Sequence, residues 1–304
     1  MWPSRSTIIA QLDQGLQAFS KEQHRLLGIA DPAARNALVL QMTASLRRLD
    51  YTRLIKSRNI SAHRADPTHR LFDPERAAAL LARNGNLDEA IWLIFLSTHF
   101  GQHKKHGWRM LRDVYSQLGK GVWTWSKVSA NPQKFRAWLQ HNFQHIGGAF
   151  GNHRKYETLN PVSNSGTANI VDSFVKCFQP SPSKWFSNLV QSTGNDPHTL
   201  FGAAYDGLTI ERFGRLAKFD FLALLGRLDL APIAPGSAYL SGATGPLRGA
   251  RLLVDGDASS QSRARDLDEI LQQLDTVLHV GMQVMEDSIC NWQKSPHKFV
   301  HFRG

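Results

Sequence analysis

The chain has 304 residues, and its 36 lysines and arginines outnumber the 25 aspartates and glutamates, which gives a net charge of +11. Hydrophobic residues make up 42% of the sequence, which excludes a largely disordered protein. Cys177 and Cys290 are too few for a disulfide scaffold or for a cluster held by four cysteines. Without a long apolar run or a signal-peptide pattern, we expect a cytoplasmic protein with no membrane contact, whose basic charge indicates a polyanionic partner.

The apolar residues recur with helical spacing along most of the chain, and no segment shows the alternation of a half-buried strand. Asp73 before Pro74 is typical of a helix start, and Gly85 of a helix end. Asn86 with Glu89 predicts a capping box at the start of the following helix. The sequence therefore predicts an all-α fold.

A further helix begins after Asn131 and ends at Gly147 and Gly148. Additional helices are expected near residues 5–27, 33–50, 107–118, 165–178, 216–228 and 263–285. The polar residues 51–73 indicate a connector, so we expect an N-terminal helical segment over 1–85 and a larger helical region over 86–304. Residues 229–262 are rich in Gly, Pro and Ser, and a loop-rich stretch of this length favours a functional role.

Positive charge is concentrated between Ser97 and Tyr156, where ten lysines and arginines accompany a single acid, Asp113. Six of the 13 histidines and four of the eight tryptophans lie in the same segment. Cations interleaved with aromatic rings suit phosphate contacts and stacking on unpaired bases. We therefore predict nucleic-acid contact here, including at Lys104 and Lys105; the alternative is a solvated helix face with tryptophans in the core.

Histidines in this segment have spacings that metal sites use. His99, His103 and His106 are spaced i, i+4, i+7 and would share one face of a helix, and His141 and His145 repeat the i, i+4 spacing. Lysines rather than carboxylates surround them, and these would not neutralise a dication. We therefore expect structural or phosphate-facing histidines, with neither a metal nor a cofactor.

Two further segments carry candidate DNA-binding residues. The polar loop after Gly147 and Gly148 offers His153, Arg154 and Lys155 for phosphate and Tyr156 for base stacking, or it is an ordinary loop. Near 236–252, glycines follow one helix and precede another, an arrangement that brings backbone close to phosphate, although a tight turn explains it almost as well. The candidates there are Gly242, Gly245, Arg248 and Gly249.

Acidic residues that follow these glycines are the candidate catalytic groups. Asp255 lies soon after the glycine-rich segment, and Glu286 and Asp287 lie within an apolar run near the C-terminus. Partial burial in such a run raises the pKa of a carboxyl group. A cap or an ion pair is the alternative for each of them, and Asp220 and Asp268 are next in order.

Taken together, five segments resemble one known family. They are THFGQHKKHGW, GGAFGNHRKYETL, ERFGRLAKFDFLALLG, PGSAYLSGATGPLRGARLL and VMEDSICNWQKSP. They resemble the alpha-glutamyl/putrescinyl thymine pyrophosphorylase family, from about residue 90 to the C-terminus. The resemblance implies a fold like that of helix-hairpin-helix DNA glycosylases, with two helical subdomains around a cleft.

The same resemblance implies roles for individual residues. Gly242, Gly245 and Gly249 would form the hairpin that grips phosphate, although this version is longer than the usual one. The catalytic aspartate of such glycosylases follows the hairpin, at the start of a later helix. Asp255 matches the local pattern but comes early, and the pair Glu286-Asp287 comes late, in one of the segments that resemble the family. Arg248 stands where glycosylases that also cut the backbone carry a lysine, which implies an enzyme that removes the base only.

The resemblance connects the chain with phages that carry hypermodified thymine and with bacterial proteins that act against phages with modified DNA. The first hypothesis is a DNA glycosylase that flips a modified or glucosylated base out of double-stranded DNA and cleaves its glycosidic bond with a carboxylate. The second is a transferase that replaces pyrophosphate on 5-hydroxymethyluracil pyrophosphate in DNA with an amine. The third is a DNA-binding module without catalysis. The base and the oligomeric state stay open.

Overall fold

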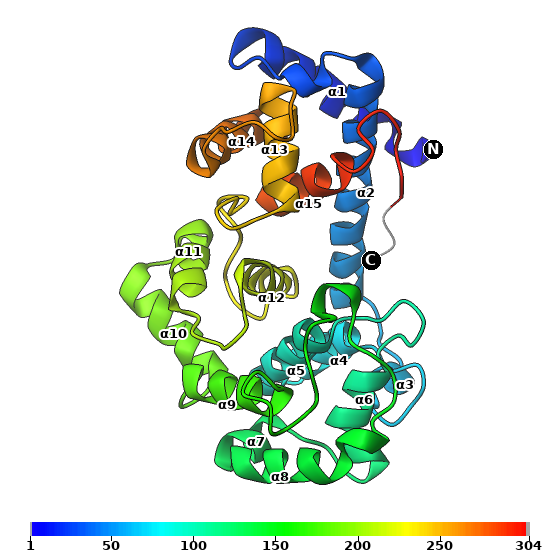
Figure 1. The fold of residues 1–304 in the computed structure, drawn as a ribbon, viewed down its shortest axis with the longest axis vertical. Coiled ribbons are helices and arrows are strands. Elements are labelled where there is room, and N and C mark those ends of the chain that lie inside the picture. Colours follow the sequence, from blue (N-terminus) through cyan, green and yellow to red (C-terminus); the bar gives the residue numbers. More distant parts are fainter. Residues whose placement is uncertain (1, 302–304) are drawn as a thin grey trace. The chain divides into compact units, whose positions relative to one another are not determined.

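The structure, a computed structural model, describes residues 2–301, and fifteen α-helices make up most of it (Figure 1). No strand forms among these residues; one isolated bridge joins His103 and Gly107. The predicted all-α fold class is confirmed.

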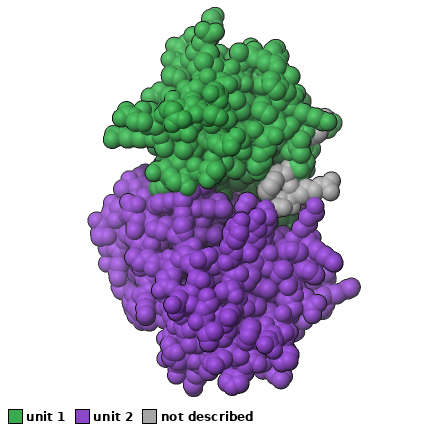
Figure 2. Space-filling view, viewed as in Figure 1, with its two compact units in different colours: residues 1–51, 235–303 green, residues 52–234, 304 purple. Residues whose placement is uncertain are grey.

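The described residues divide into two compact units, which Figure 2 colours separately. Unit 1 contains residues 2–51 and 235–301, from both ends of the chain, and unit 2 contains residues 52–234. The division therefore falls at different places from the expected one near residue 85. The long helix α2 (Pro32–Ser57) belongs to unit 1 over most of its length and to unit 2 in its last turns.

Unit 1 has an aliphatic core that is built from both ends of the chain. Leucine, isoleucine, valine and methionine side chains pack around Phe19 and Trp292, both fully buried. Indole Nε1 of Trp292 donates to the carbonyl of Ala34, a bond of 3.0 Å that joins the C-terminal part of the unit to α2. The other helices of unit 1 are α1 (Ser6–Glu22), α13 (Gly245–Asp255), α14 (Ala264–Leu278) and α15 (Met282–Trp292).

Unit 2 has an aromatic core. The fully buried Phe174 lies 3.9 Å from Phe95 and 5.5 Å from Trp92, measured between ring centroids. Its helices are α3 (Ala62–Ala65), α4 (Pro74–Arg83), α5 (Leu87–Phe100), α6 (Arg109–Tyr115), α7 (Trp125–Ala130), α8 (Pro132–Asn142), α9 (Thr167–Cys177), α10 (Pro182–Thr193), α11 (Pro197–Gly207) and α12 (Arg215–Arg227).

Two of the three predicted helix starts form with the expected side-chain cap. Asp73 accepts from the amide of Arg76 at the start of α4, and Asn131 accepts from the amide of Lys134 at the start of α8. The predicted capping box at Asn86 is wrong, because its side chain makes no cap hydrogen bond. Glu89 is buried instead, and its carboxylate accepts hydrogen bonds from other helices.

The Glu89 carboxylate accepts from the hydroxyl of Tyr115 and from the amide of Trp125, the latter at 2.6 Å. Burial raises its pKa, and the two hydrogen bonds oppose that shift. Tyr115 is affected in the same direction, since burial and the neighbouring carboxylate raise its pKa. Glu89 therefore ties α5 to α6 and α7 inside unit 2, rather than capping its own helix.

The predicted helix over 263–285 is two helices. The first, α14, ends at Leu278, and the next residue, His279, adopts a left-handed backbone conformation with φ +51°. Gly281 follows with φ +84°, and α15 begins at Met282. The apolar spacing continues across this break because both helices face the same core of unit 1, so periodicity alone gave no sign of the turn.

Candidate functional site

The basic segment 97–156 lies entirely in unit 2. Its six lysines are all exposed and form no ion pair with any residue between 2 and 301: Lys104, Lys105, Lys120, Lys127, Lys134 and Lys155. Its arginines are engaged, since Arg109 and Arg112 lie 3.6 and 3.9 Å from Asp113 and Arg136 pairs with Asp172. The lysines thus leave an uncompensated positive surface, and the arginines are held in place.

The predicted helical face of His99, His103 and His106 does not form. Helix α5 ends at Phe100, and Gly101 takes φ +65°, so the two later histidines lie in a tight turn outside the helix. His103 Nδ1 accepts from the amides of Lys105 and His106 and closes that turn. The turn places Lys104 and Lys105 at an exposed tip.

His99 is instead buried inside unit 2. Its Nε2 lies 3.0 Å from the hydroxyl oxygen of Thr167, and that hydroxyl donates its one proton to the carbonyl of Thr158. Nε2 therefore carries the imidazole proton and donates to Thr167. Burial, together with the charges of Arg154 and Arg212, lowers the pKa of His99 to about 3. The ring is neutral at physiological pH and serves packing.

Arg154 is half-buried within the same network. Its Nε donates to the carbonyl of Thr98 at 2.8 Å, and its guanidinium lies 5.9 Å from the centre of the Phe213 ring. Burial lowers its pKa, and the charges of Asp220 and Glu157 oppose that shift. Its neighbours His153, Lys155 and Tyr156 are exposed, Tyr156 at 79%. The loop thus directs Arg154 inward and the other three outward.

The loop that carries Arg154 is packed against the end of α5. A methyl group at Gly151 would lie 2.9 Å from the carbonyl carbon of Gly101, and the Gly151 amide donates to the carbonyl of Phe100. The amide of Gly147, just before the loop, donates to Asp113. These bonds fix the loop, so Lys155 and Tyr156 project from a defined support.

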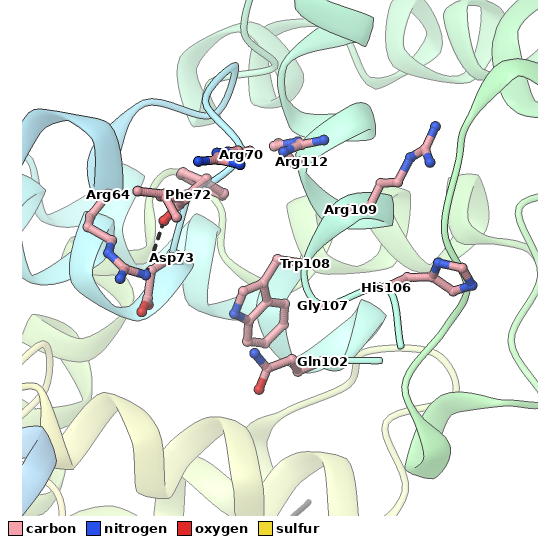
Figure 3. Close-up of a pocket in the computed structure, with 11 residues that line it drawn as sticks. Arg64, Arg70, Phe72, Asp73, Gln102, His106, Gly107, Trp108, Arg109 and Arg112 are labelled. Atoms are coloured by element: carbon pink, nitrogen blue, oxygen red, sulfur yellow. Dashed lines mark hydrogen bonds between the residues drawn. The ribbon is translucent and has the colours of Figure 1, made fainter. Parts of the chain in front are cut away.

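A basic pocket of about 330 Å³ lies in unit 2 between α3, the loop that follows it, and the start of α6 (Figure 3). Arg70 and Arg112 are drawn next to each other, Arg64 borders the opposite side of the group, and the indole of Trp108 lies below them. The lining residues are Arg64, Arg70, Leu71, Phe72, Asp73, Gln102, His106, Gly107, Trp108, Arg109 and Arg112.

Sequence reasoning missed the contribution of residues 51–73 to this pocket. The segment is organised by its own hydrogen bonds: Asp66 accepts from the amide and hydroxyl of Thr68, and the amide of Asp73 donates to the carbonyl of Arg64. Two His-Arg pairs six residues apart, at 63–64 and 69–70, were the available signal. The rings of the two histidines stack 4.2 Å apart, which brings the neighbouring arginines into one region.

The predicted hairpin glycines have different surroundings in unit 1. Gly242 is exposed in a turn with φ +73°, and Arg248 is exposed on α13. Gly245 and Gly249 lie within α13 and face α15: a methyl group at Gly249 would lie 2.3 Å from the carbonyl oxygen of Ile289. Close helix packing thus accounts for Gly245 and Gly249, and a turn accounts for Gly242.

The candidate carboxylates all lie in unit 1, on two helices. Asp255 ends α13 and accepts from the hydroxyl of Ser260 in the turn that follows. Asp287, on α15, pairs with Arg48 and accepts from Asn291 at 2.9 Å. Glu286 beside it is 8% exposed.

Asp268 has a structural position that the sequence did not indicate. Its carboxylate accepts from the hydroxyl of Ser237 and from the amides of Ala238 and Leu240, at 2.8 to 3.1 Å. One carboxylate on α14 therefore holds the chain that leads into α13. Asp220, the other reserve candidate, lies on α12 in unit 2, where its charge acts on Arg154.

Within residues 2–301, no three His, Cys, Asp or Glu side chains form a group that would hold a metal ion. The helices in this range also include none with the length and apolar character needed to span a membrane.

Comparison with known proteins decides the family. Residues 33–304 match the family described as alpha-glutamyl/putrescinyl thymine pyrophosphorylase clade 3. The chain belongs to this family. The resemblance noted from the five sequence segments is therefore confirmed, and the match begins well before residue 90. The family description is that of enzymes acting on modified thymine in DNA. No curated protein and no solved structure matches the chain.

Proposed function

We propose that this protein is a DNA glycosylase that removes a modified base from phage DNA and so protects a bacterial cell. The charge distribution supports it most directly: residues 52–234 contain 23 lysines and arginines against 13 acids, and the remaining residues contain 13 against 12. Unpaired exposed lysines at Lys104, Lys105 and Lys155 suit phosphate contacts. Membership of the family is the reason for proposing a modified base as the substrate.

In this reaction the base leaves the stack before its glycosidic bond breaks. The electron pair of the C1′–N bond departs with the base, and positive charge develops on the sugar. A carboxylate of unit 1 stabilises that charge and takes a proton from the water that attacks C1′. Asp255, Glu286 and Asp287 are the candidates. The proposed reaction uses no cofactor bound by the cysteines or histidines.

The decisive experiment incubates the protein with phage DNAs that carry different modified bases and analyses free bases and nucleosides by mass spectrometry. A glycosylase releases free base and leaves alkali-labile abasic sites. Intact DNA without released base contradicts the proposal. Activity should survive an excess of chelator, because lysines rather than carboxylates are the sequence neighbours of His103 and His106.

The catalytic carboxylate is found by testing Asp255→Asn, Glu286→Gln and Asp287→Asn separately. Loss of one preorganised charge typically costs about 10²–10³ in rate. Arg48→Gln is the matched control for Asp287→Asn, since it breaks the same ion pair and keeps the carboxylate. Wild-type release of base by all three variants would place the catalytic acid elsewhere.

The family description favours a second candidate, a transferase that acts on a pyrophosphorylated thymine in DNA. An amine nitrogen would attack the methylene carbon of 5-hydroxymethyluracil pyrophosphate, pyrophosphate would leave, and the amine would lose a proton to a carboxylate. The same mass spectra distinguish the two reactions. A transferase adds the mass of the amine, releases pyrophosphate and leaves every glycosidic bond intact.

A further inference from the structure

The basic pocket of unit 2 has an excess of positive charge that the protein does not neutralise. Its lining contains four arginines and one acid, Asp73. That carboxylate caps α4 through the Arg76 amide and lies 3.5 Å from the Arg76 guanidinium, so its charge is already engaged. Asp113, outside the lining, lies 3.6 Å or more from Arg109 and Arg112. The pocket therefore retains at least two uncompensated positive charges.

Two of the guanidinium groups are oriented before any ligand arrives. Arg64 donates to the carbonyl of Leu71 and Arg112 to the carbonyl of His69, each at 3.4 Å. Each bond uses a single N–H, and a guanidinium has five. The guanidinium of Arg70 is exposed and makes no hydrogen bond or ion pair with any residue from 2 to 301. The three groups thus offer a partly preorganised set of donors.

The charge and shape of this pocket indicate the ligand. A single carboxylate carries one negative charge and would leave the arginines undercompensated, whereas a phosphate monoester carries nearly two. Planar guanidinium groups also match phosphate oxygens in pairs. The volume, about 330 Å³, is in the range of small-molecule sites and exceeds the needs of one phosphate group. The half-buried indole of Trp108 lines the same pocket, below Arg70 and Arg112 in Figure 3, and offers a face for a ring.

We propose that this pocket binds a nucleotide through its terminal phosphate, with Arg70 and Arg112 on the phosphate, Arg64 adding positive charge at the opposite border and Trp108 against the base. The nucleotide is either a free nucleoside 5′-phosphate or the 5′-phosphorylated end of a DNA strand. This binding does not depend on the proposed glycosylase reaction.

Calorimetric titration of the full chain at low ionic strength tests the pocket. We expect thymidine 5′-phosphate to bind at least about tenfold more tightly than thymidine, because thymidine cannot form the charge-assisted hydrogen bonds that the phosphate accepts. The Arg64→Ala/Arg70→Ala variant should weaken binding by about 10- to 100-fold. The matched control is Arg263→Ala/Arg265→Ala, which removes two exposed arginines from α14 of unit 1 and the residue before it, and should leave binding unchanged.

The single variant Arg70→Ala tests the pocket in a protein that should fold normally, since the Arg70 side chain is exposed and makes no hydrogen bond or ion pair among the described residues. Trp108→Leu should weaken thymidine 5′-phosphate but leave inorganic pyrophosphate unchanged. Equal competition by thymidine 5′-phosphate and by a 5′-phosphorylated oligonucleotide supports the free nucleotide, and preference for the oligonucleotide supports the DNA end. Absence of phosphate binding, equal affinity in the arginine variants, or indifference to Trp108 would overturn the proposal. Base release measured on the same variants reports separately on the glycosylase.

Discussion

Units 1 and 2 differ in what they bury and in what they expose. Unit 1 has an aliphatic core and nearly balanced charge, and its acids are engaged with neighbours such as Arg48 and Ser260. Residues 52–234, which form unit 2, contain 22 of the 29 aromatic residues and a net charge of +10 out of +11. The first three candidate acids, Asp255, Glu286 and Asp287, lie in unit 1, whereas the exposed lysines that suit phosphate, such as Lys104 and Lys105, lie in unit 2.

The largest expected effect concerns the aromatic core. Phe174→Ala should lower the free energy of unfolding by about 3–5 kcal/mol, because it opens a cavity and removes several ring contacts. Leu271→Ala, in the core of unit 1, should cost about 2–5 kcal/mol. Denaturant unfolding measures both variants. A smaller loss for Phe174→Ala than for Leu271→Ala would contradict the dominance of the aromatic cluster in unit 2.

The pH dependence of stability should depend on His99 of unit 2. Its pKa in the folded protein is about 3, below the 6.5 of a free histidine, so the unfolded chain alone gains a proton as pH falls through this interval. Stability should drop on acidification by about 1.4 kcal/mol per pH unit from this group, or roughly 3 kcal/mol at pH 4.

His99→Gln keeps an N–H donor and should remove the loss of stability on acidification that His99 causes. Urea unfolding midpoints measured from pH 7 to pH 4 test this expectation. His106→Gln, at an exposed histidine, is the control and should behave like wild type. An unchanged pH profile in His99→Gln would show that the buried ring does not resist protonation.

Helix packing in unit 1 is tested at the glycines of α13. Gly249→Ala should cost about 1–3 kcal/mol, since its methyl group would meet the backbone carbonyl of Ile289 at 2.3 Å. Gly245→Ala meets the Cys290 sulfur at 2.7 Å, and a side chain yields more readily than backbone. Thermal unfolding should rank Gly249→Ala as the more damaging, and the reverse order would contradict the packing role.

The smallest expected effect concerns DNA affinity. Lys104→Glu/Lys105→Glu, at the exposed turn of unit 2, should weaken DNA binding by about tenfold and reduce the salt slope by about 1 for each phosphate that the variant no longer neutralises. Arg263→Glu/Arg265→Glu in unit 1 changes the net charge equally and should have less effect. Fluorescence anisotropy over a range of salt concentrations compares them. Equal reductions in affinity would mean that overall charge, rather than unit 2, determines binding.

The sequence predicted what depends on local pattern. Apolar spacing indicated the helices, and Asp73 and Asn131 indicated where two of them begin. It failed where distant residues decide the outcome. Glu89 forms no capping box because the Tyr115 hydroxyl and the Trp125 amide donate hydrogen bonds to it in the interior of unit 2. The basic pocket forms because residues 64–73 fold onto the start of α6.

Helices α10 and α11 were not predicted, although both begin with a capping residue followed by proline. Ser181 before Pro182 and Asp196 before Pro197 carry the same signal as Asp73 before Pro74. The helix-start signal was therefore present in the sequence at both helices.

The discontinuous make-up of unit 1 has a consequence for the newborn chain. Leu12, Leu16 and Phe19 of α1 belong to a core whose other members include Leu271 and Trp292, and these are synthesised some 250 residues later. During translation α2 follows α1 directly, but the whole of unit 2 emerges before α1 meets α14. Unit 2, a single stretch of chain, can fold as it leaves the ribosome, while part of the apolar face of α1 stays uncovered until the C-terminal helices have been made.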